Sequence, residues 1–198
     1  MSDVLEYKII LGSAAGLLTL GAHIPYFLDV LKGRTKPHIF TWLIWTLLLS
    51  IGIAAQLSKG AGFGAWSTIG DAVATGAIFL CCFKYGEKNI TRSDKITFGF
   101  ALVGVVLWVI TSDPLWAVIF AVIADAFGFF PTFRKSFNKP HEETALTYLI
   151  VVVGYLIGLF SLQAYSLTTV LYPAYLVIGN GSLWIYLLMR RKQMKNHA

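Results

Sequence analysis

Charged residues are scarce in this chain. They make up 13% of its 198 residues, against roughly 25% in an average soluble domain, while hydrophobic residues make up 57%. So few charges cannot cover a water-facing surface, which excludes a disordered chain and argues against a soluble enzyme. Cysteine is also rare: Cys81 and Cys82 are adjacent in an apolar run, where we expect them to pack inside a helix and form no disulfide framework. The composition therefore predicts a protein that is surrounded by a lipid bilayer.

Seven long apolar runs follow one another along the sequence. They cover residues 8–31, 39–58, 65–84, 96–111, 115–137, 144–163 and 168–189. A membrane-spanning helix takes about 20 mainly apolar residues, and each run comes near that length. The runs are nearly continuous and lack the alternating pattern of a β-barrel. We therefore expect an all-α membrane protein with seven transmembrane helices and no room for a separate soluble domain.

Lysine and arginine are distributed unevenly among the connections. Fourteen of the sixteen lie at the ends of runs three and five, in the connections after runs one, three and five, or after run seven; only Lys8 and Lys59 lie elsewhere. The positive-inside rule then places the N-terminus outside and the C-terminus in the cytoplasm, in a plasma or inner membrane. The net charge of +6 is spread over these small groups, which favours an anionic membrane surface, and not nucleic acid, as the partner.

An internal repeat relates the two halves of the sequence. Pro25 precedes the hexapeptide KPHIFT at 36–41, and Pro131 precedes KPHEET at 139–144, with four identities in the six positions. Runs one to three therefore repeat as runs five to seven, with run four as a linker. This predicts two parallel three-helix bundles in a 3+1+3 arrangement, related by an axis along the membrane normal. The units are residues 1–84, the linker helix 85–112, and residues 113–198 with a basic cytoplasmic tail.

The match between the halves continues beyond the hexapeptides. Trp45 and Tyr148 each lie eight residues after the loop proline. Asp71 and Asn180 each follow a glycine in the third run of their unit. These pairs are therefore expected to occupy equivalent places in the two bundles.

With this layout the chain resembles the SWEET/PQ-loop (MtN3/saliva-like) transporter superfamily over nearly its whole length. The likeness rests on the two three-helix units, the proline in each first helix, the basic loops, and the acid or amide in each third helix. Where the PQ-loop pattern has Pro-Gln, this chain has Pro-Tyr at 25–26 and Pro-Thr at 131–132. The resemblance implies a carrier that moves a sugar, an amino acid or a vitamin-like solute by alternating access. It also implies that Asp71 and Asn180 flank a central pocket, as paired asparagines do in sugar-carrying relatives.

Ionisable side chains inside membrane spans are costly and mark candidate functional positions. His23 and Asp125 lie close to the prolines of equivalent helices, so a contact between them would be either a proton relay or a packing hydrogen bond. Asp29 lies one turn beyond Pro25. It is either a cap or salt-bridge partner of nearby bases or, as the resemblance to proton-coupled carriers implies, a coupling acid. An aspartate at position 71 is suited to holding a cation or a proton.

Aromatic residues, at 15% of the chain, are candidates for the walls of a pocket. A ring over the flat face of a sugar or base binds it without charge, which makes Trp45 and Tyr148 candidate substrate-binding residues. Trp66 and Tyr175 form a second matched pair, because each lies five residues before the polar residue of its third run. The alternative for these side chains is an aromatic belt at the membrane interface.

The remaining motifs concern helix shape and excluded chemistry. Pro25 and Pro131 lie within runs, where each permits a kink that serves either as a hinge or only to shape the packing. Glycines spaced by four at 12 and 16, and at 154 and 158, predict close helix approach. No residue spacing predicts a metal site, no cofactor motif stands in a suitable context, and no nucleophile has a nearby base. We therefore expect a carrier and no enzyme. A receptor or sensor of the same fold and a homo-oligomer are both left open.

Overall fold

The computed structural model describes residues 2–110 and 113–196, which are mainly helical and contain no strand. In chain order the elements are α1 (Ser2–Leu31), α2 (Ile39–Ser58), the 3-10 helix η1 (Gly62–Ala65), α3 (Trp66–Tyr85), α4 (Arg92–Ile110), α5 (Pro114–Asn138), the 3-10 helix η2 (Pro140–Glu142), α6 (Ala145–Phe160) and α7 (Leu167–Asn196). The predicted all-α class is thus confirmed for the part of the chain that is described.

Five of the described helices are long and apolar enough to cross a membrane: Leu5–Leu31, Ile39–Ser58, Gly62–Tyr85, Pro114–Asn138 and Leu167–Lys195. The helix α6 is apolar but has 16 residues, fewer than the predicted run 144–163, because the chain turns at Ser161. The helix α4 replaces the predicted run 96–111, whose last residue lies outside the described residues, as do position 112 of the predicted linker and the chain ends at 1 and 197–198. The described part of the predicted basic tail is a continuation of α7.

Local side-chain chemistry sets the starts of two of these helices. Asp113 accepts a hydrogen bond from the N–H of Leu115 at 2.7 Å, and Pro114 occupies the first turn of α5, where its missing N–H costs nothing. At the start of α4 the N–H of Thr91 donates to Asp94 Oδ2 at 2.8 Å, and the N–H of Asp94 donates to Thr91 Oγ1 at 3.3 Å. This reciprocal pair satisfies two donors that the first helical turn would otherwise leave unpaired.

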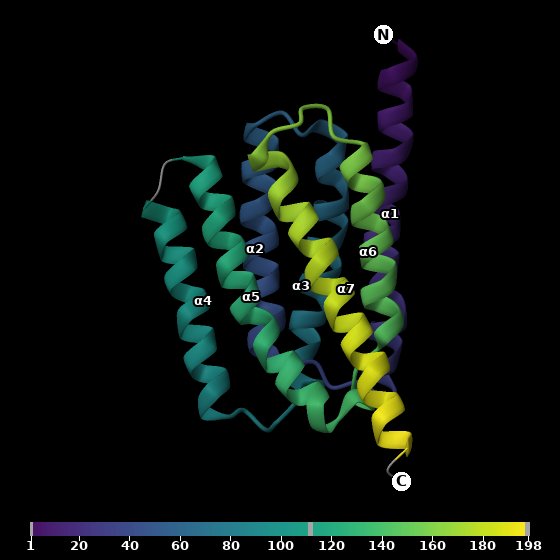
Figure 1. Ribbon diagram of the computed structural model, residues 1–198, viewed down its shortest axis with the longest axis vertical. Coiled ribbons are helices and arrows are strands. Elements are labelled where there is room, and N and C mark those ends of the chain that lie inside the picture. The colour runs from purple at the N-terminus through teal and green to yellow at the C-terminus, as the bar shows by residue number, and fades with distance from the viewer. Residues whose placement is uncertain (1, 111–112, 197–198) are drawn as a thin grey trace.

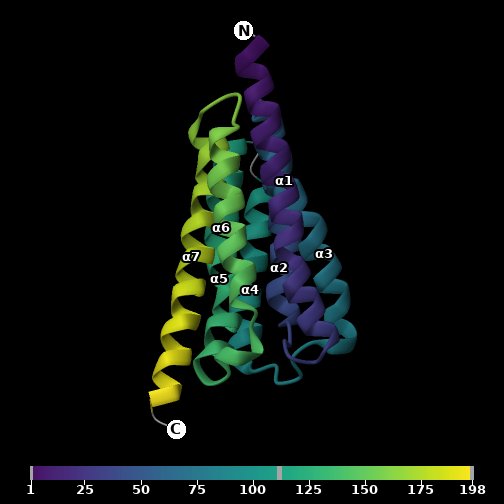
Figure 2. The same cartoon turned by 90° about the vertical axis from the view of Figure 1, so that its right-hand side faces the viewer.

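The helices pack as two groups of three with α4 at one side (Figures 1 and 2). In the first group α3 packs against both α1 and α2, and in the second α7 packs against both α5 and α6. The two groups meet through α1 with α6 and through α2 with α5, while α4 packs mainly on α5. Each group therefore has its third helix between the other two, and each contributes its first and second helices to the interface.

Glycines allow the closest of these contacts. A β-carbon at Gly12 or Gly70 would overlap backbone atoms of Phe63 and Gly16, so α1 lies directly against α3 and the turn before it. A β-carbon at Gly154 in α6 would overlap the side chain of Thr19 in α1. The predicted role of the spaced glycines in close helix approach is thus confirmed.

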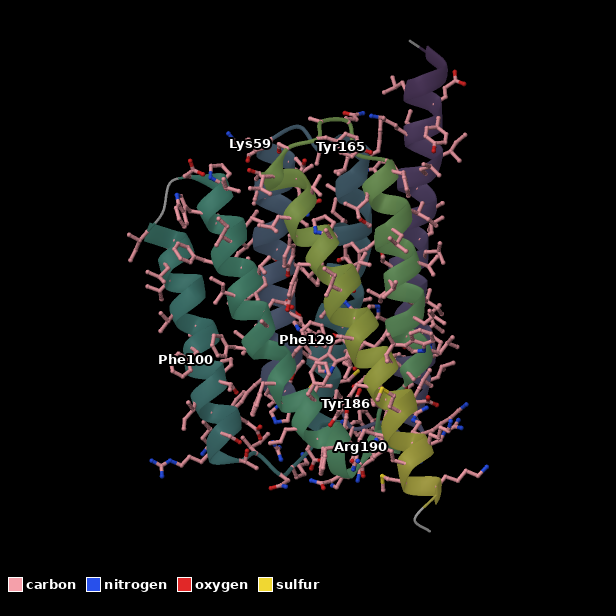
Figure 3. All side chains as sticks on the ribbon, viewed as in Figure 1. Lys59, Phe100, Phe129, Tyr165, Tyr186 and Arg190 are labelled. Carbon is pink, nitrogen blue, oxygen red and sulfur yellow. The ribbon has the colours of Figure 1, made fainter. Side chains whose placement is uncertain are left out.

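The connections that carry most of the basic residues lie at one end of the bundle. The segments 32–38, 86–91 and 139–144 and the end of α7 share this end, here called the basic end, whereas Lys59 and Tyr165 lie at the opposite end (Figure 3). Between the ends the outer faces expose large apolar side chains such as Leu17, Leu80 and Ile178. Apolar surface of this extent is typical of a protein that is surrounded by lipid.

Candidate functional site

A small cavity lies in the middle of the bundle, between the two helix groups. Its lining residues come from α1, α2, α3, α5, α6 and α7 and are His23, Trp42, Trp45, Leu49, Asp71, Thr75, Asp125, Phe129, Thr147, Tyr148, Val151, Leu176 and Asn180. All of them are buried. The cavity measures about 20 Å³, and a single water molecule needs roughly 10–15 Å³ measured in this way. It therefore takes in one water molecule and no larger solute in this conformation.

Asp71 of α3 has side-chain partners at both carboxylate oxygens. His23 Nε2 lies 3.3 Å from Oδ1, and Tyr155 donates its hydroxyl proton to Oδ2 at 2.7 Å. Thr75, one turn further along α3, adds a longer contact to Oδ1 at 3.4 Å. The other ring nitrogen of His23 lies 3.0 Å from the carbonyl oxygen of Thr19. A buried carboxylate is stable only when its lone pairs are satisfied, and Asp71 meets that condition through residues of α1, α3 and α6.

Asp125 of α5 faces the same cavity with much less support. Tyr172 donates to Oδ1 at 3.3 Å, and Oδ2 accepts no hydrogen bond from the described residues. The hydroxyl of Tyr175 also interacts with this carboxylate, but Oδ2 is left without a hydrogen-bond partner among the described residues. The possible contact between His23 and Asp125 is not formed, because His23 pairs with Asp71. Asp125 is therefore the less fully satisfied of the two cavity carboxylates.

Two more polar atoms of cavity-lining residues have no partner among the described residues. They are Nε1 of Trp45, which can only donate, and Oγ1 of Thr147, which can donate and accept. Asn180 donates its Nδ2 to the carbonyl oxygen of Leu176 in its own helix, at 2.9 Å. Buried polar atoms without partners are rare, and their gathering around one cavity indicates a place where a ligand or ordered water completes the bonding.

Aromatic rings form the wall of the cavity nearest the basic end. The ring centres of Trp42 and Trp45 are 5.2 Å apart in an edge-on arrangement, and those of Trp45 and Phe129 are 4.6 Å apart. Tyr148 lines the cavity from the second helix group and donates its hydroxyl proton to Glu143 Oε2 at 2.8 Å. The predicted pair Trp45 and Tyr148 thus lies at the cavity, and Phe129, labelled in Figure 3, completes the wall.

Not every residue predicted for the site lies at the cavity. Trp66 is 39% exposed and packs edge-on against Phe63. This position agrees with the alternative role, an aromatic side chain at the membrane interface. Tyr175 stacks on Tyr172 behind the lining residues. Asp29 lies at the basic end, where it pairs with Arg34 at 3.3 Å. The six that do line the cavity are His23, Trp45, Asp71, Asp125, Tyr148 and Asn180.

A buried ion pair closes the basic end beneath the aromatic wall. Lys135 of α5 donates to Glu143, the acceptor that also binds Tyr148, and to the carbonyl oxygen of Lys36 at 2.6 Å. Both charged side chains are buried, with 3% and 1% of their surfaces exposed for Lys135 and Glu143. Arg191 of α7 donates to the carbonyl oxygen of Glu143. The loops of both repeats and the end of α5 are therefore bonded to one another here.

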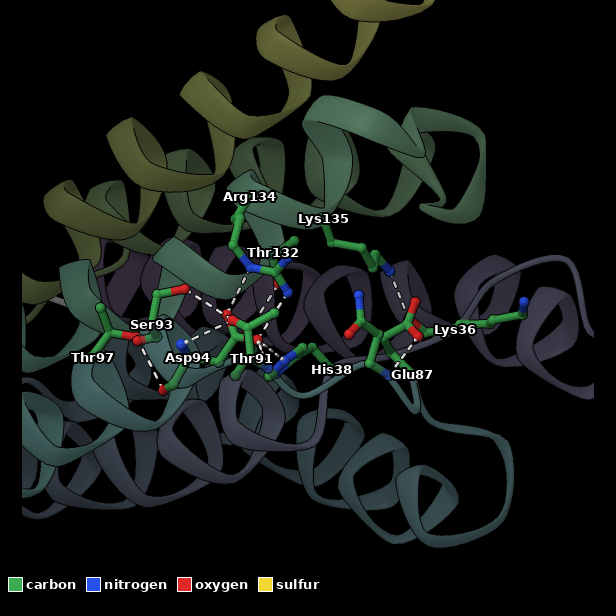
Figure 4. Close-up of polar contacts among 12 residues, drawn as sticks. Lys36, His38, Glu87, Thr91, Ser93, Asp94, Thr97, Thr132, Arg134 and Lys135 are labelled. Atoms are coloured by element: carbon green, nitrogen blue, oxygen red, sulfur yellow. Dashed lines mark hydrogen bonds and ion pairs between the residues drawn. The ribbon is translucent and has the colours of Figure 1, made fainter.

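A second polar cluster at the basic end connects α4 to the bundle (Figure 4). Arg134 binds both oxygens of Asp94 at 2.8 Å, and His38 Nε2 lies 3.3 Å from Asp94 Oδ2. Burial lowers the pKa of His38 below its usual value of 6.5, and this outweighs the raising effect of Asp94. A neutral imidazole is therefore favoured, and α4 is fixed to α5 by a fully buried carboxylate.

Several residues of this arrangement could not be identified from the sequence. Thr147, Tyr155 and Tyr172 carry no motif, and their roles depend on which helices become neighbours. The pairing of Lys135 with Glu143 had a usable signal in the sequence. The two residues carry opposite charges and lie eight residues apart, on either side of the turn that begins the second hexapeptide. Among the described residues, no three His, Cys, Asp or Glu side chains gather to hold a metal ion.

Comparison of the chain with models of known families, with curated proteins and with solved structures gives no match. The function must therefore be argued from the cavity and its surroundings.

Proposed function

We propose that the protein is a membrane carrier of the SWEET/PQ-loop type that moves a small polar solute by alternating access. The observation that carries the proposal is the cavity between the two helix groups. Positions that match in the sequence repeat, Trp45 with Tyr148 and Asp71 with Asn180, meet at this one place. A shared central site with unpaired polar atoms is what a carrier built from two repeats requires.

The proposed 3+1+3 arrangement is supported by contacts that cross between the helix groups. Thr41 and Thr144 end the two hexapeptides, and each bonds to the first helix of the other group. Thr132 donates to Thr41 at 3.1 Å, and Thr144 donates to Asp29 at 3.0 Å. Matching contacts made in both directions are expected when two equivalent units are related by an axis along the membrane normal.

The small size of the cavity supports a closed state in an alternating-access cycle. At the basic end Lys135, Glu143 and Tyr148 close it, and at the opposite end Gln163 donates its backbone N–H to Ala61 at 3.1 Å. A solute larger than one water enters only if the two helix groups separate at one end. We propose that Pro25 and Pro131, which lie inside α1 and α5, serve as the hinges of this movement.

We further propose that the basic end faces the cytoplasm and that the protein lies in the plasma or inner membrane. The support is the gathering of the basic connections at one end, which the positive-inside rule assigns to the cytoplasm. Proton coupling is proposed for His23 and Asp125, because both line the cavity. Asp29 lies with Arg34 and Thr144 at the basic end. We therefore propose that Asp29 helps to close that end, and that it affects proton coupling only through the opening and closing of the bundle.

Reconstitution tests this proposal. Proteoliposomes that contain the purified chain should take up solutes from a panel of labelled sugars, amino acids, amines and vitamins, and protein-free liposomes should not. Asp71→Asn provides a matched control that keeps the shape of the site. If the protein binds a solute of the panel but moves none across the membrane, the alternative of a receptor or sensor with the same fold is the correct one.

A further inference from the structure

From the polar atoms around the cavity we infer that its solute is a small organic cation that also carries a hydrogen-bond acceptor. This inference rests on the proposed function and names the class of its substrate. It begins with charge: the lining residues include two aspartates and one histidine, and none of them is a lysine or an arginine. A buried anion without a basic partner is strongly disfavoured, so the lining selects against phosphates and carboxylates.

The two aspartates are not equally available to a solute. Asp71 is held by His23 and Tyr155, which occupy both of its oxygens. Asp125 accepts a bond of 3.3 Å from Tyr172, and its Oδ2 has no hydrogen-bond partner among the described residues although the residue is 1% exposed. A bound ammonium group would supply both the missing donor and the opposite charge. We therefore assign the positive group of the solute to Asp125.

The other unpaired atoms specify the rest of the solute. Nε1 of Trp45 can only donate, so it requires an acceptor such as a hydroxyl or carbonyl oxygen. Thr147 provides a hydroxyl that is satisfied by either kind of group. The rings of Trp42, Trp45 and Phe129 present aromatic surface beside these atoms, and such surface attracts organic cations.

Titration calorimetry of the full chain in detergent with two sets of compounds tests the inference. The three compounds of each set have a similar molecular frame and differ in charge, which is positive, zero or negative. The first set is tyramine, tyrosol and 4-hydroxyphenylacetate; the second is ethanolamine, ethylene glycol and glycolate. At least one cation should bind about 10- to 100-fold more tightly than its neutral and anionic counterparts, as for a buried hydrogen bond to a charged group. Equal or tighter binding of the neutral or anionic compound overturns the inference, and so does the failure of both cations to bind.

Variants locate the charge preference. Asp125→Asn keeps the shape and the Tyr172 contact, and should bring the affinity for the cation down to that of the neutral compound. Trp45→Phe keeps a ring but removes the donor, so it should weaken cation and neutral compound alike. A preference that survives Asp125→Asn contradicts the assignment. Unfolding temperatures measured without solute show whether each variant is folded.

The outcome separates this inference from the proposed function. Cations that bind as expected but do not cross proteoliposome membranes leave the inference standing and contradict the carrier. Transport of another solute without any preference for cations supports the carrier and contradicts the inference.

Discussion

Positions 71 and 180 match in the sequence repeat and both line the cavity, but they are held in different ways. Asp71 is bonded to side chains of α1 and α6, whereas among the described residues Asn180 bonds only to the carbonyl of Leu176 in its own helix. The hexapeptide histidines differ too: His38 is fully buried beside Asp94, and His141 is exposed. The first half thus carries buried polar contacts at positions that the second half leaves nearly free.

The opposite holds one turn beyond the helix prolines. Lys135 in the second half is buried in an ion pair with Glu143, whereas its counterpart Asp29 pairs with an exposed Arg34. The helices of the two halves make matching contacts, but each half has its own polar contacts. Equivalent positions therefore need not contribute equally to stability or to binding, and mutations of matched pairs measure the inequality.

The largest expected effect concerns the residues one turn beyond the prolines. Lys135→Met leaves Glu143 charged, buried and without its partner, which should lower the free energy of unfolding by about 3–5 kcal/mol. Asp29→Asn removes a partly exposed pair and should cost about 0–1 kcal/mol. Reversible unfolding in mixed detergent micelles measures both. Equal losses for the two variants would contradict the contrast.

A smaller difference is expected between the two third-helix positions. Asp71→Ala leaves His23 Nε2 and the Tyr155 hydroxyl without their buried acceptor and should cost about 2–3 kcal/mol. Asn180→Ala removes one hydrogen bond within a helix and should cost about 1 kcal/mol or less. The same unfolding measurement applies, with Asp71→Asn as the isosteric control. A larger loss for Asn180→Ala would show that the described contacts of Asp71 do not stabilise the bundle.

The smallest effect is expected from the histidines, as a dependence on pH. The pKa of His38 is lowered by burial, so the unfolded chain binds its proton at a higher pH than the folded chain does. His38 therefore does not lower the free energy of unfolding at a pH well above 6.5, where it is neutral in both states. Below that value the unfolded chain takes up the proton more readily, and the free energy of unfolding falls. His38→Gln should therefore reduce the fall in unfolding temperature between neutral and mildly acidic pH. The exposed counterpart serves as control, and His141→Gln should leave the fall unchanged.

The sequence was sufficient to predict the helical class and six of the thirteen cavity residues. Long apolar runs locate the helices, and the repeat aligns Trp45 with Tyr148 and Asp71 with Asn180. Helix ends were less predictable, since the turn at Ser161 depends on how the loops of both halves pack. The pairing of His23 with Asp71 was not predictable for the same reason: sequence distance from a proline does not show which helix face meets which neighbour.

Accessibility of the cavity from both sides of the membrane tests the central claim of alternating access most directly. Thr147 lines the cavity and is buried, and Thr147→Cys in a Cys81→Ser, Cys82→Ser background provides a single thiol at that point. An impermeant thiol reagent applied to right-side-out and to inverted membrane vesicles should modify this thiol in both. Modification in one orientation only, or in neither, would contradict a carrier.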